Sequence, residues 1–181
     1  KYDNPTGTLN DLYEGKRLGE IWGYTTDGFI MTEAEAAEQA KRQAYISNTW
    51  IPGDIRYADL NGDGVVNTGD SNKGPINTLD NHGDLTVIGN QTPRYRFNIN
   101  LGLSWKNFDV RALFEGVLKR DLWLSNEVFW GFSGVWNSAI NDYHVDNSWS
   151  ESNPNAYYPV PTWSSRSRQT QTKYLQDASY I

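Results

Sequence analysis

The chain has 181 residues and a formal charge of −6, and its 16 basic residues form no run, so we expect no nucleic-acid partner. It contains no cysteine, which excludes disulfides, thiolate metal sites and a Cys nucleophile. The 8 Trp, 11 Tyr and 6 Phe are typical of sugar-binding surfaces or of the aromatic girdles of membrane barrels. No apolar run is long enough for a membrane helix, and no signal peptide or initiator Met opens the chain, so we expect an internal fragment.

The first predicted elements are a strand-like run and a short helix. Residues 18–29, "LGEIWGYTTDGF", read as strand, and residues 33–45 read as helix because Thr32 and Glu35 form a capping box ahead of an alanine-rich stretch. The apolar face of this helix is small, so we expect it to lie on a surface. Residues 47–90 then form a long connection rich in Gly, Asp and Asn.

Part of this connection, "DLNGDGVVNTGD" at residues 59–70, places oxygen atoms at the spacing of a calcium loop. The predicted ligands at positions 1, 3, 5, 7, 9 and 12 are Asp59, Asn61, Asp63, the carbonyl of Val65, Asn67 and Asp70. Two features depart from an EF-hand: position 12 is Asp where Glu is usual, and "IRYAD" ahead of the loop reads as a strand rather than a helix. The pattern is closer to the dockerin variant. A polar turn that satisfies its own backbone without metal is the alternative, and the oxygen spacing favours a structural calcium ion.

The clearest pattern is a hairpin at residues 94–119. "RYRFNINLGLSW" and "FDVRALFEGV" both alternate apolar and polar residues, and the two residues between them, Lys106 and Asn107, predict a tight turn. The expected pairs on the apolar face are Trp105–Phe108, Leu103–Val110, Leu101–Ala112, Ile99–Phe114 and Phe97–Gly116. On the other face, the expected pairs are Ser104–Asp109, Gly102–Arg111 and Asn98–Glu115.

Two environments could hold this hairpin: the core of a soluble domain or a lipid bilayer. Residues 95–105 span roughly 33 Å along the strand, and a tilt of about 40° reduces this to roughly 25 Å, the height of the apolar band of an outer-membrane barrel. In a barrel the residues expected to face lipid are Tyr95, Phe97, Ile99, Leu101, Leu103, Trp105, Phe108, Val110, Ala112 and Phe114. Periodicity alone leaves both environments open.

The last third of the chain reads as a long loop followed by a returning strand. Residues 121–136, "DLWLSNEVFWGFSGVW", are dense in aromatics without clean alternation, and residues 137–172 are polar, as in an ordered surface loop. "KYLQDASYI" at the end of the sequence returns toward a strand.

Five stretches, in this order, resemble the C-terminal barrel region of SusC/RagA-family TonB-dependent outer-membrane transporters. They are "GDIRYADLNGDGVVN", "DNHGDLTVIGNQTPRYRF", "LGLSWKNFDVRALFEGVLKRDLW", "WSESNPNAYYP" and "YLQDASYI". The resemblance covers roughly residues 18–181. The helix at residues 33–45 is not part of the shared pattern and looks like a loop insertion, and Leu118 stands where the family usually has Gly.

The resemblance implies that residues 1–181 are a fragment of an all-β, 22-stranded transmembrane barrel with long extracellular loops and one short inserted helix. It implies import of oligosaccharides or peptides across the outer membrane of a Gram-negative bacterium. The implied partners are a SusD-like lipoprotein lid and TonB, reached through the missing N-terminal part, in a dimer of transporter–lipoprotein pairs. The turn at Lys106 and Asn107 would be periplasmic, which puts the loops at 59–70 and about 122–172 outside the cell.

The aromatic side chains of the outer loop are candidate contacts for the lid or for a sugar. We expect this role for Trp130, Trp136 and Trp149, while a place in the aromatic girdle is the alternative and is strongest for Trp123. A different class of function also remains open: a secreted, calcium-stabilised carbohydrate-binding β-domain that uses exposed Trp123, Trp130 and Trp136.

No catalytic function is expected. The only histidines, His82 and His144, read as solvated loop residues rather than as bases. Glu115 and Glu127 could serve as the acid and nucleophile of a glycosidase, but paired carboxylates are common by chance.

Overall fold

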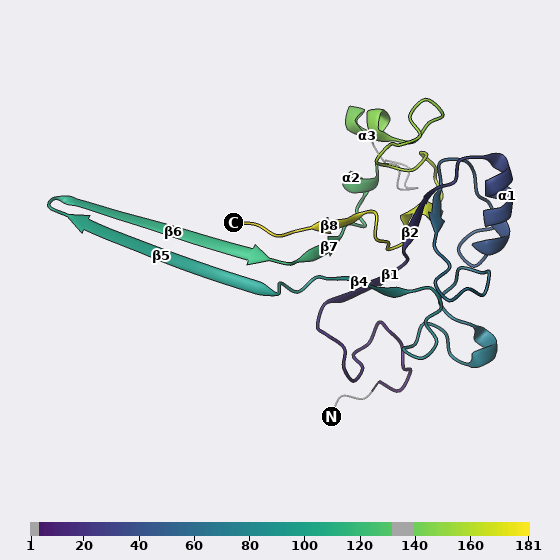
Figure 1. The fold of residues 1–181 in the computed structure, drawn as a ribbon, viewed down its shortest axis with the longest axis horizontal. Coiled ribbons are helices and arrows are strands. Elements are labelled where there is room, and N and C mark those ends of the chain that lie inside the picture. The colour runs from purple at the N-terminus through teal and green to yellow at the C-terminus, as the bar shows by residue number, and fades with distance from the viewer. Residues whose placement is uncertain (1–3, 132–139) are drawn as a thin grey trace.

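The computed structural model describes residues 4–131 and 140–181, which form a compact head and a long hairpin that projects from it (Figure 1). Regular structure is mostly strand, with a few short helices, as expected for an all-β chain. The elements occur in the following order: β1 Glu20–Gly23, β2 Thr26–Phe29, α1 Glu33–Arg42, β3 Ile55–Tyr57, η1 Ser71–Lys73, β4 Thr86–Asn90, β5 Tyr95–Trp105, β6 Phe108–Leu118, β7 Asp121–Trp123, α2 Glu127–Trp130, α3 Asp142–Asn147, η2 Arg166–Arg168 and β8 Leu175–Asp177. In the described part of the chain, none of the helices has the length and apolar character needed to cross a membrane.

The hairpin of β5 and β6 has the register predicted from the sequence. Trp105 pairs with Phe108 at the tip, and the register continues without a break to Tyr95 and Leu118. Lys106 has φ 52°, the left-handed conformation that tight hairpin turns require, and its Nζ lies 4.8 Å from the centre of the Trp105 ring. Alternation and turn length therefore suffice to set this pairing.

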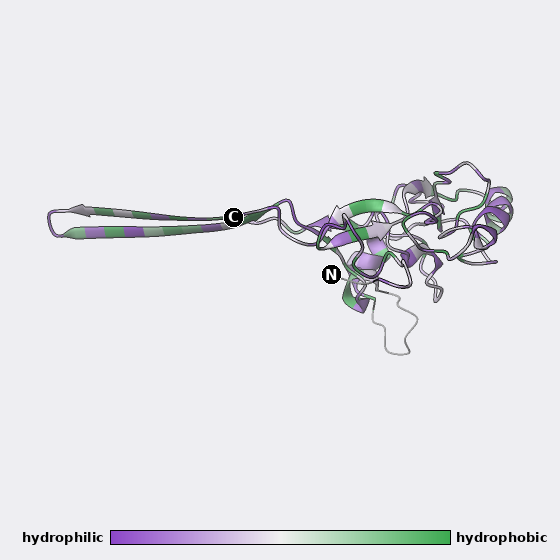
Figure 2. Cartoon of the chain, turned by 90° about the horizontal axis from the view of Figure 1, so that it is seen from below, coloured by the Kyte–Doolittle hydropathy of each residue, from purple (hydrophilic) through white to green (hydrophobic). Residues whose placement is uncertain are grey.

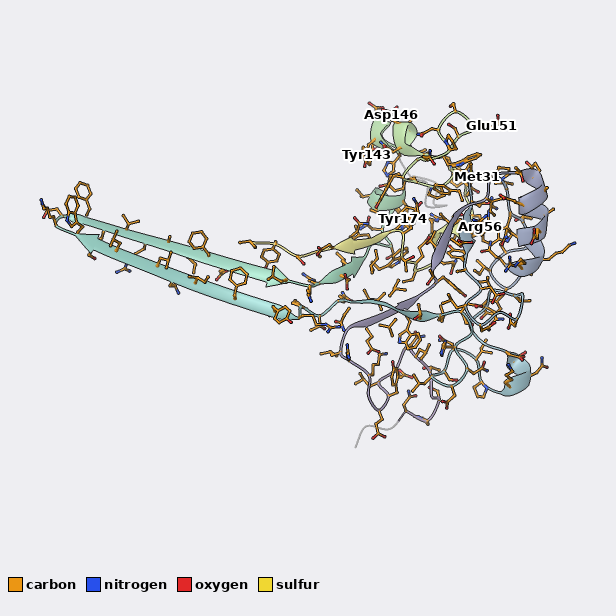
Figure 3. All side chains as sticks on the ribbon, viewed as in Figure 1. Met31, Arg56, Tyr143, Asp146, Glu151 and Tyr174 are labelled. Carbon is orange, nitrogen blue, oxygen red and sulfur yellow. The ribbon has the colours of Figure 1, made fainter. Side chains whose placement is uncertain are left out.

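The hairpin presents two chemically different faces, and neither is covered by the head over most of its length. Figure 2 shows the alternation as green and purple bands along the projecting strands, and the sticks of Figure 3 stand free on both sides of it. On the apolar face, Leu103 is 68% exposed and Phe108 is 69% exposed. On the polar face, Asn98 donates a hydrogen bond to Glu115 over 2.9 Å. So large an exposed apolar surface on an element without a core needs a partner.

The head is assembled from small sheets that join distant segments. Each sheet has two antiparallel strands, in the pairs β1–β4, β2–β3 and β7–β8. Among the described residues no sheet closes into a barrel, because these strands and the hairpin are far fewer than 22. The 22-stranded barrel therefore stays a prediction. Beyond β8, Tyr180 pairs with Val117 at the edge of β6, so the end of the chain lies beside the base of the hairpin (Figure 1).

The helix α1 begins as the capping pattern predicts and ends earlier than expected. Thr32 accepts the Glu35 N–H through its side chain, and Glu35 accepts the Met31 N–H. The helix ends at Arg42 rather than at residue 45, since the next side chain, Gln43, is fully buried and bonds to β3 through Tyr57 N–H and the Ile55 carbonyl. Tertiary hydrogen bonds thus stop the helix.

The head has an aromatic core of its own. Its buried members come from nearly every segment of the head: Tyr24, Ile30, Ala36, Trp50, Ile55, Tyr57, Val66, Trp130, Tyr158 and Tyr174. Tyr174 lies at the centre of this core, fully buried, 4.8 Å from the ring of Trp130 and 5.4 Å from that of Tyr157 (Figure 3). These rings follow no helical or strand period, so periodicity cannot reveal the cluster they form.

Candidate functional site

The first half of the predicted metal loop forms a tight turn around Asp59. The Asp59 carboxylate accepts N–H groups from Gly62 over 2.6 Å and from Gly64 over 2.9 Å, and the guanidinium of Arg42 lies 3.5 Å away. Both glycines have positive φ, which the reversal of the chain requires. Burial tends to raise the pKa of Asp59, but the two N–H bonds and the charge of Arg42 together lower it, so this carboxyl remains ionised near neutral pH.

Three further groups whose oxygen atoms could bind a cation lie on the same turn: the Asn61 and Asp63 side chains and the Val65 carbonyl. The Asn61 side-chain oxygen accepts the Asp63 N–H, and the Asp63 carboxylate accepts the Val65 N–H, each over 2.8 Å. The Asn61 amide donates to the second Asp63 oxygen over 3.1 Å. Asp63 and Val65 are exposed to solvent. The turn thus carries two carboxylates, one amide oxygen and one main-chain carbonyl, the oxygen types that a hard cation prefers. The Asp59 side chain is 8% exposed, and the Val65 carbonyl accepts the Asn67 amide over 3.3 Å.

The second half of the loop does not close this set. The Asn67 side-chain oxygen accepts the Gly69 N–H, and Asp70 caps η1 by accepting the Asn72 N–H over 2.9 Å, with Lys73 at 3.8 Å. Within the described ranges, no group of three or more His, Cys, Asp or Glu side chains has an arrangement that could hold a metal ion. Asp59, Asn61, Asp63 and Val65 therefore share one turn, whereas the Asp70 side chain caps η1.

A residue that the spacing argument missed, Asp84, contacts the loop from outside. Its side chain is fully buried and accepts N–H groups from Leu60 and Asn67 over 2.7 and 2.9 Å. Asp84 follows the predicted loop by 14 positions, so no local motif connects the two.

The predicted aromatic contacts are mostly internal. Trp130 is 7% exposed and Trp149 is 8% exposed, because both pack into the head, and we correct their assignment as direct contacts to a partner or ligand. Trp136 lies outside the described residues. Trp123 is half-buried with its ring 5.7 Å from that of Trp130. Sequence reasoning missed Trp163, whose side chain is 63% exposed.

His144, Glu115 and Glu127 lie in different parts of the fold. His144 is 5% exposed, packs 5.0 Å from the Tyr158 ring, and bonds through Nε2 to the Phe129 carbonyl over 3.0 Å, so the expectation of a solvated residue is wrong for it. Glu115 accepts its hydrogen bond from Asn98 on the hairpin, whereas Glu127 lies in the first turn of α2.

Comparison with known proteins finds similarity to part of a TonB-dependent receptor. The chain is similar to TonB-dependent receptor P3 of Formosa agariphila, with 27% identity over 170 residues, which is 94% of this chain. The same match spans 15% of the relative's length, so the chain corresponds to a small part of such a protein. No protein-family profile matches the chain.

Proposed function

We propose that the chain is a segment of the outer-membrane barrel of a SusC/RagA-family TonB-dependent transporter that imports oligosaccharides or peptides. The observation that carries this proposal is the hairpin of β5 and β6. Its strands of 11 residues each match the length of a transmembrane β-strand. Similarity to a TonB-dependent receptor over nearly the whole chain supports the same assignment.

The physical case rests on what surrounds each face of the hairpin. In water, an apolar face of this size would be unfavourable, at about 25 cal/mol for each Å² exposed. In a barrel the apolar residues contact lipid, while Asn98, Arg111 and Glu115 on the reverse face line a polar interior. Trp105 and Phe108 at the tip and Tyr95 at the base then lie at the two interfaces, where aromatic side chains are favoured.

In this orientation the head lies outside the cell, on the side opposite the short turn at Lys106 and Asn107. The head then forms part of the surface to which a SusD-like lipoprotein lid docks, in a dimer of transporter–lipoprotein pairs, and TonB supplies energy through another part of the protein. Because Trp130 and Trp149 are internal, we assign the aromatic contact of this loop to the exposed Trp163.

We further propose that the loop at residues 59–70 binds calcium through Asp59, Asn61, Asp63 and the Val65 carbonyl. The ion would supply positive charge to two carboxylates on an exposed turn and hold that turn in one shape. Asp70 caps η1, and the Asn67 side chain bonds to the Gly69 N–H and to the Val65 carbonyl, so water would complete the coordination shell.

The alternative, a secreted carbohydrate-binding domain, lacks a comparable observation. It depends on exposed tryptophans at positions 123, 130 and 136, but Trp130 is buried and Trp123 is half-buried against it. It also leaves the apolar face of the hairpin without a partner.

Lipid exposure of the hairpin tests the transporter proposal. The full-length protein, with a single fluorophore attached at Leu101→Cys or Asn100→Cys, is reconstituted into vesicles that contain a lipid-bound quencher. We expect strong quenching at position 101 and weak quenching at position 100, because neighbouring residues of a strand point to opposite faces. Equal quenching at both positions, or recovery of the protein in buffer rather than in detergent, would overturn the proposal.

A further inference from the structure

The acidic loop is held closed by a carboxylate that lies outside the predicted twelve residues. Asp84 is fully buried, and one of its oxygens accepts N–H groups from Leu60 over 2.7 Å and from Asn61 over 3.4 Å. Its other oxygen accepts the N–H of Asn67 over 2.9 Å. One side chain therefore joins residues 60 and 61 to residue 67, and bonds from N–H groups to a carboxylate are stronger than neutral ones.

The backbone beside Asp84 is pressed against the same end of the loop. The Asp84 N–H donates to the Asn67 carbonyl over 3.0 Å. Gly83 has φ 59°, and a Cβ atom at this position would lie 2.5 Å from both the Asn67 carbonyl oxygen and the Gly69 nitrogen. The approach is thus so close that only glycine fits, which is independent evidence that residues 83–84 dock on the loop.

Asp70, which the twelve-residue spacing places at the closing position, has a different role. Its side chain accepts from Asn72 and lies 3.8 Å from Lys73, and its own N–H donates to Asn81 over 2.9 Å. These bonds belong to η1 and the connection after it. They bring the carboxylate to no residue of the turn at 59–65.

We propose that Asp84, rather than Asp70, closes the loop and positions Asp59, Asn61 and Asp63 for the ion. This inference rests on the calcium site proposed above, but the closure itself does not require the ion. By fixing both ends of the segment 60–67 in advance, Asp84 reduces the conformational entropy that ion binding would otherwise lose. Asp84 is a positioning residue, because its oxygens are directed at backbone N–H groups.

Calcium titration of the full-length protein in detergent tests the inference. Asp84→Asn replaces one acceptor with an amide donor that faces N–H groups, and we expect it to weaken calcium binding about 10- to 100-fold, as for residues that support metal ligands. Asp70→Asn is the matched control and should bind calcium as the wild type does. Wild-type affinity in Asp84→Asn together with lost affinity in Asp70→Asn would overturn the inference.

Limited proteolysis in chelator separates this inference from the calcium proposal. Without calcium, we expect cleavage at residues 59–70 in Asp84→Asn, but protection in the wild type and in Asp63→Ala. If the wild type binds no calcium and this cleavage pattern is still seen, the calcium proposal fails and the closure by Asp84 stands. Protection of Asp84→Asn in chelator overturns the closure whether or not calcium binds.

A second variant keeps the test decisive if Asp84→Asn does not assemble. Gly83→Ala leaves the carboxylate in place but introduces a methyl group where the Asn67 carbonyl and the Gly69 nitrogen lie. It should expose the loop to protease in the same way. A protected loop in Gly83→Ala would contradict the docking of residues 83–84 on which the inference depends.

Discussion

Asp54 and Arg166 form a buried ion pair between segments 112 residues apart. The Asp54 side chain is fully buried and also accepts the Ile51 N–H over 2.9 Å and the Ser167 hydroxyl over 2.8 Å. Burial raises the pKa of Asp54, although these two bonds and the charge of Arg166 oppose the shift. The pair therefore holds the segment just ahead of β3 against η2.

Loss of one partner from this pair should destabilise the head strongly. Arg166→Ala leaves a buried carboxylate without its counter-charge, at a cost of about 3–5 kcal/mol. Lys73→Ala is the control, because the exposed Lys73 lies 3.8 Å from Asp70, and exposed pairs contribute about 0–1 kcal/mol. Protease resistance of the head against temperature would measure both variants, and equal losses would contradict the special role of the buried pair.

The two faces of the hairpin should respond differently to charge. Leu101→Arg places a cation on the apolar face near the middle of β5 and should cost about 2–4 kcal/mol in barrel stability. Asn100→Arg changes the neighbouring residue on the polar face, which already carries Arg111, and should cost much less. Folding in lipid vesicles, followed by the electrophoretic mobility of the unheated protein, gives both values. Comparable defects would show that the faces are assigned the wrong way round.

The calcium proposal predicts a contrast between a side-chain and a main-chain donor. Asp63→Ala should lose the ion, since the Asp63 carboxylate is one of two on the turn. Val65→Ala should bind nearly as well as the wild type, because only the carbonyl of Val65 is used. Mass spectrometry of the native protein would report occupancy, and a calcium ion retained in full by Asp63→Ala would rule out this site.

Alkaline pH should loosen the aromatic core. Burial, followed by the nearby Tyr157 and Tyr143, raises the pKa of Tyr158 to about 12, whereas a tyrosine in the unfolded chain ionises near pH 10. The folded state therefore keeps its proton longer, so the contribution of Tyr158 to stability is complete below about pH 10 and is lost as the pH rises toward about 12.

Tyr158→Phe isolates this effect, because it removes the ionisable hydroxyl and keeps the ring. Across this pH interval, the variant should lose less protease resistance in the head than the wild type does. Tyr180→Phe, at a tyrosine that is mostly exposed, should leave the wild-type profile unchanged. Identical profiles for Tyr158→Phe and the wild type would contradict the linkage.

The proposed docking of a lipoprotein lid should depend on Trp163, a residue that is 63% exposed. Trp163→Ala should reduce copurification of the lipoprotein. In contrast, Trp130→Ala removes a buried ring and should destabilise the head by about 3–5 kcal/mol. Full copurification with Trp163→Ala would exclude this residue as a docking contact.

Elements that depend on local chemistry were predictable from the sequence. The pairing of Trp105 with Phe108, and every pair of the register that follows, comes from a period of two and a two-residue turn. The start of α1 likewise follows from Thr32 and Glu35, which are three residues apart. In both cases the residues that determine the structure are close neighbours in the chain, so their types and spacing are enough to predict the local conformation.

The arrangement of the head, in contrast, depends on contacts between segments that are far apart in the sequence. Trp130 and Trp149 look like surface aromatics in a polar loop, and only contacts with distant segments bury them. Asp54 meets Arg166, and Asp84 meets the loop at residues 59–70, across separations at which no periodicity or motif spacing relates the partners. A buried carboxylate needs donors wherever the fold provides them, so the chain had to fold before these partners could be identified.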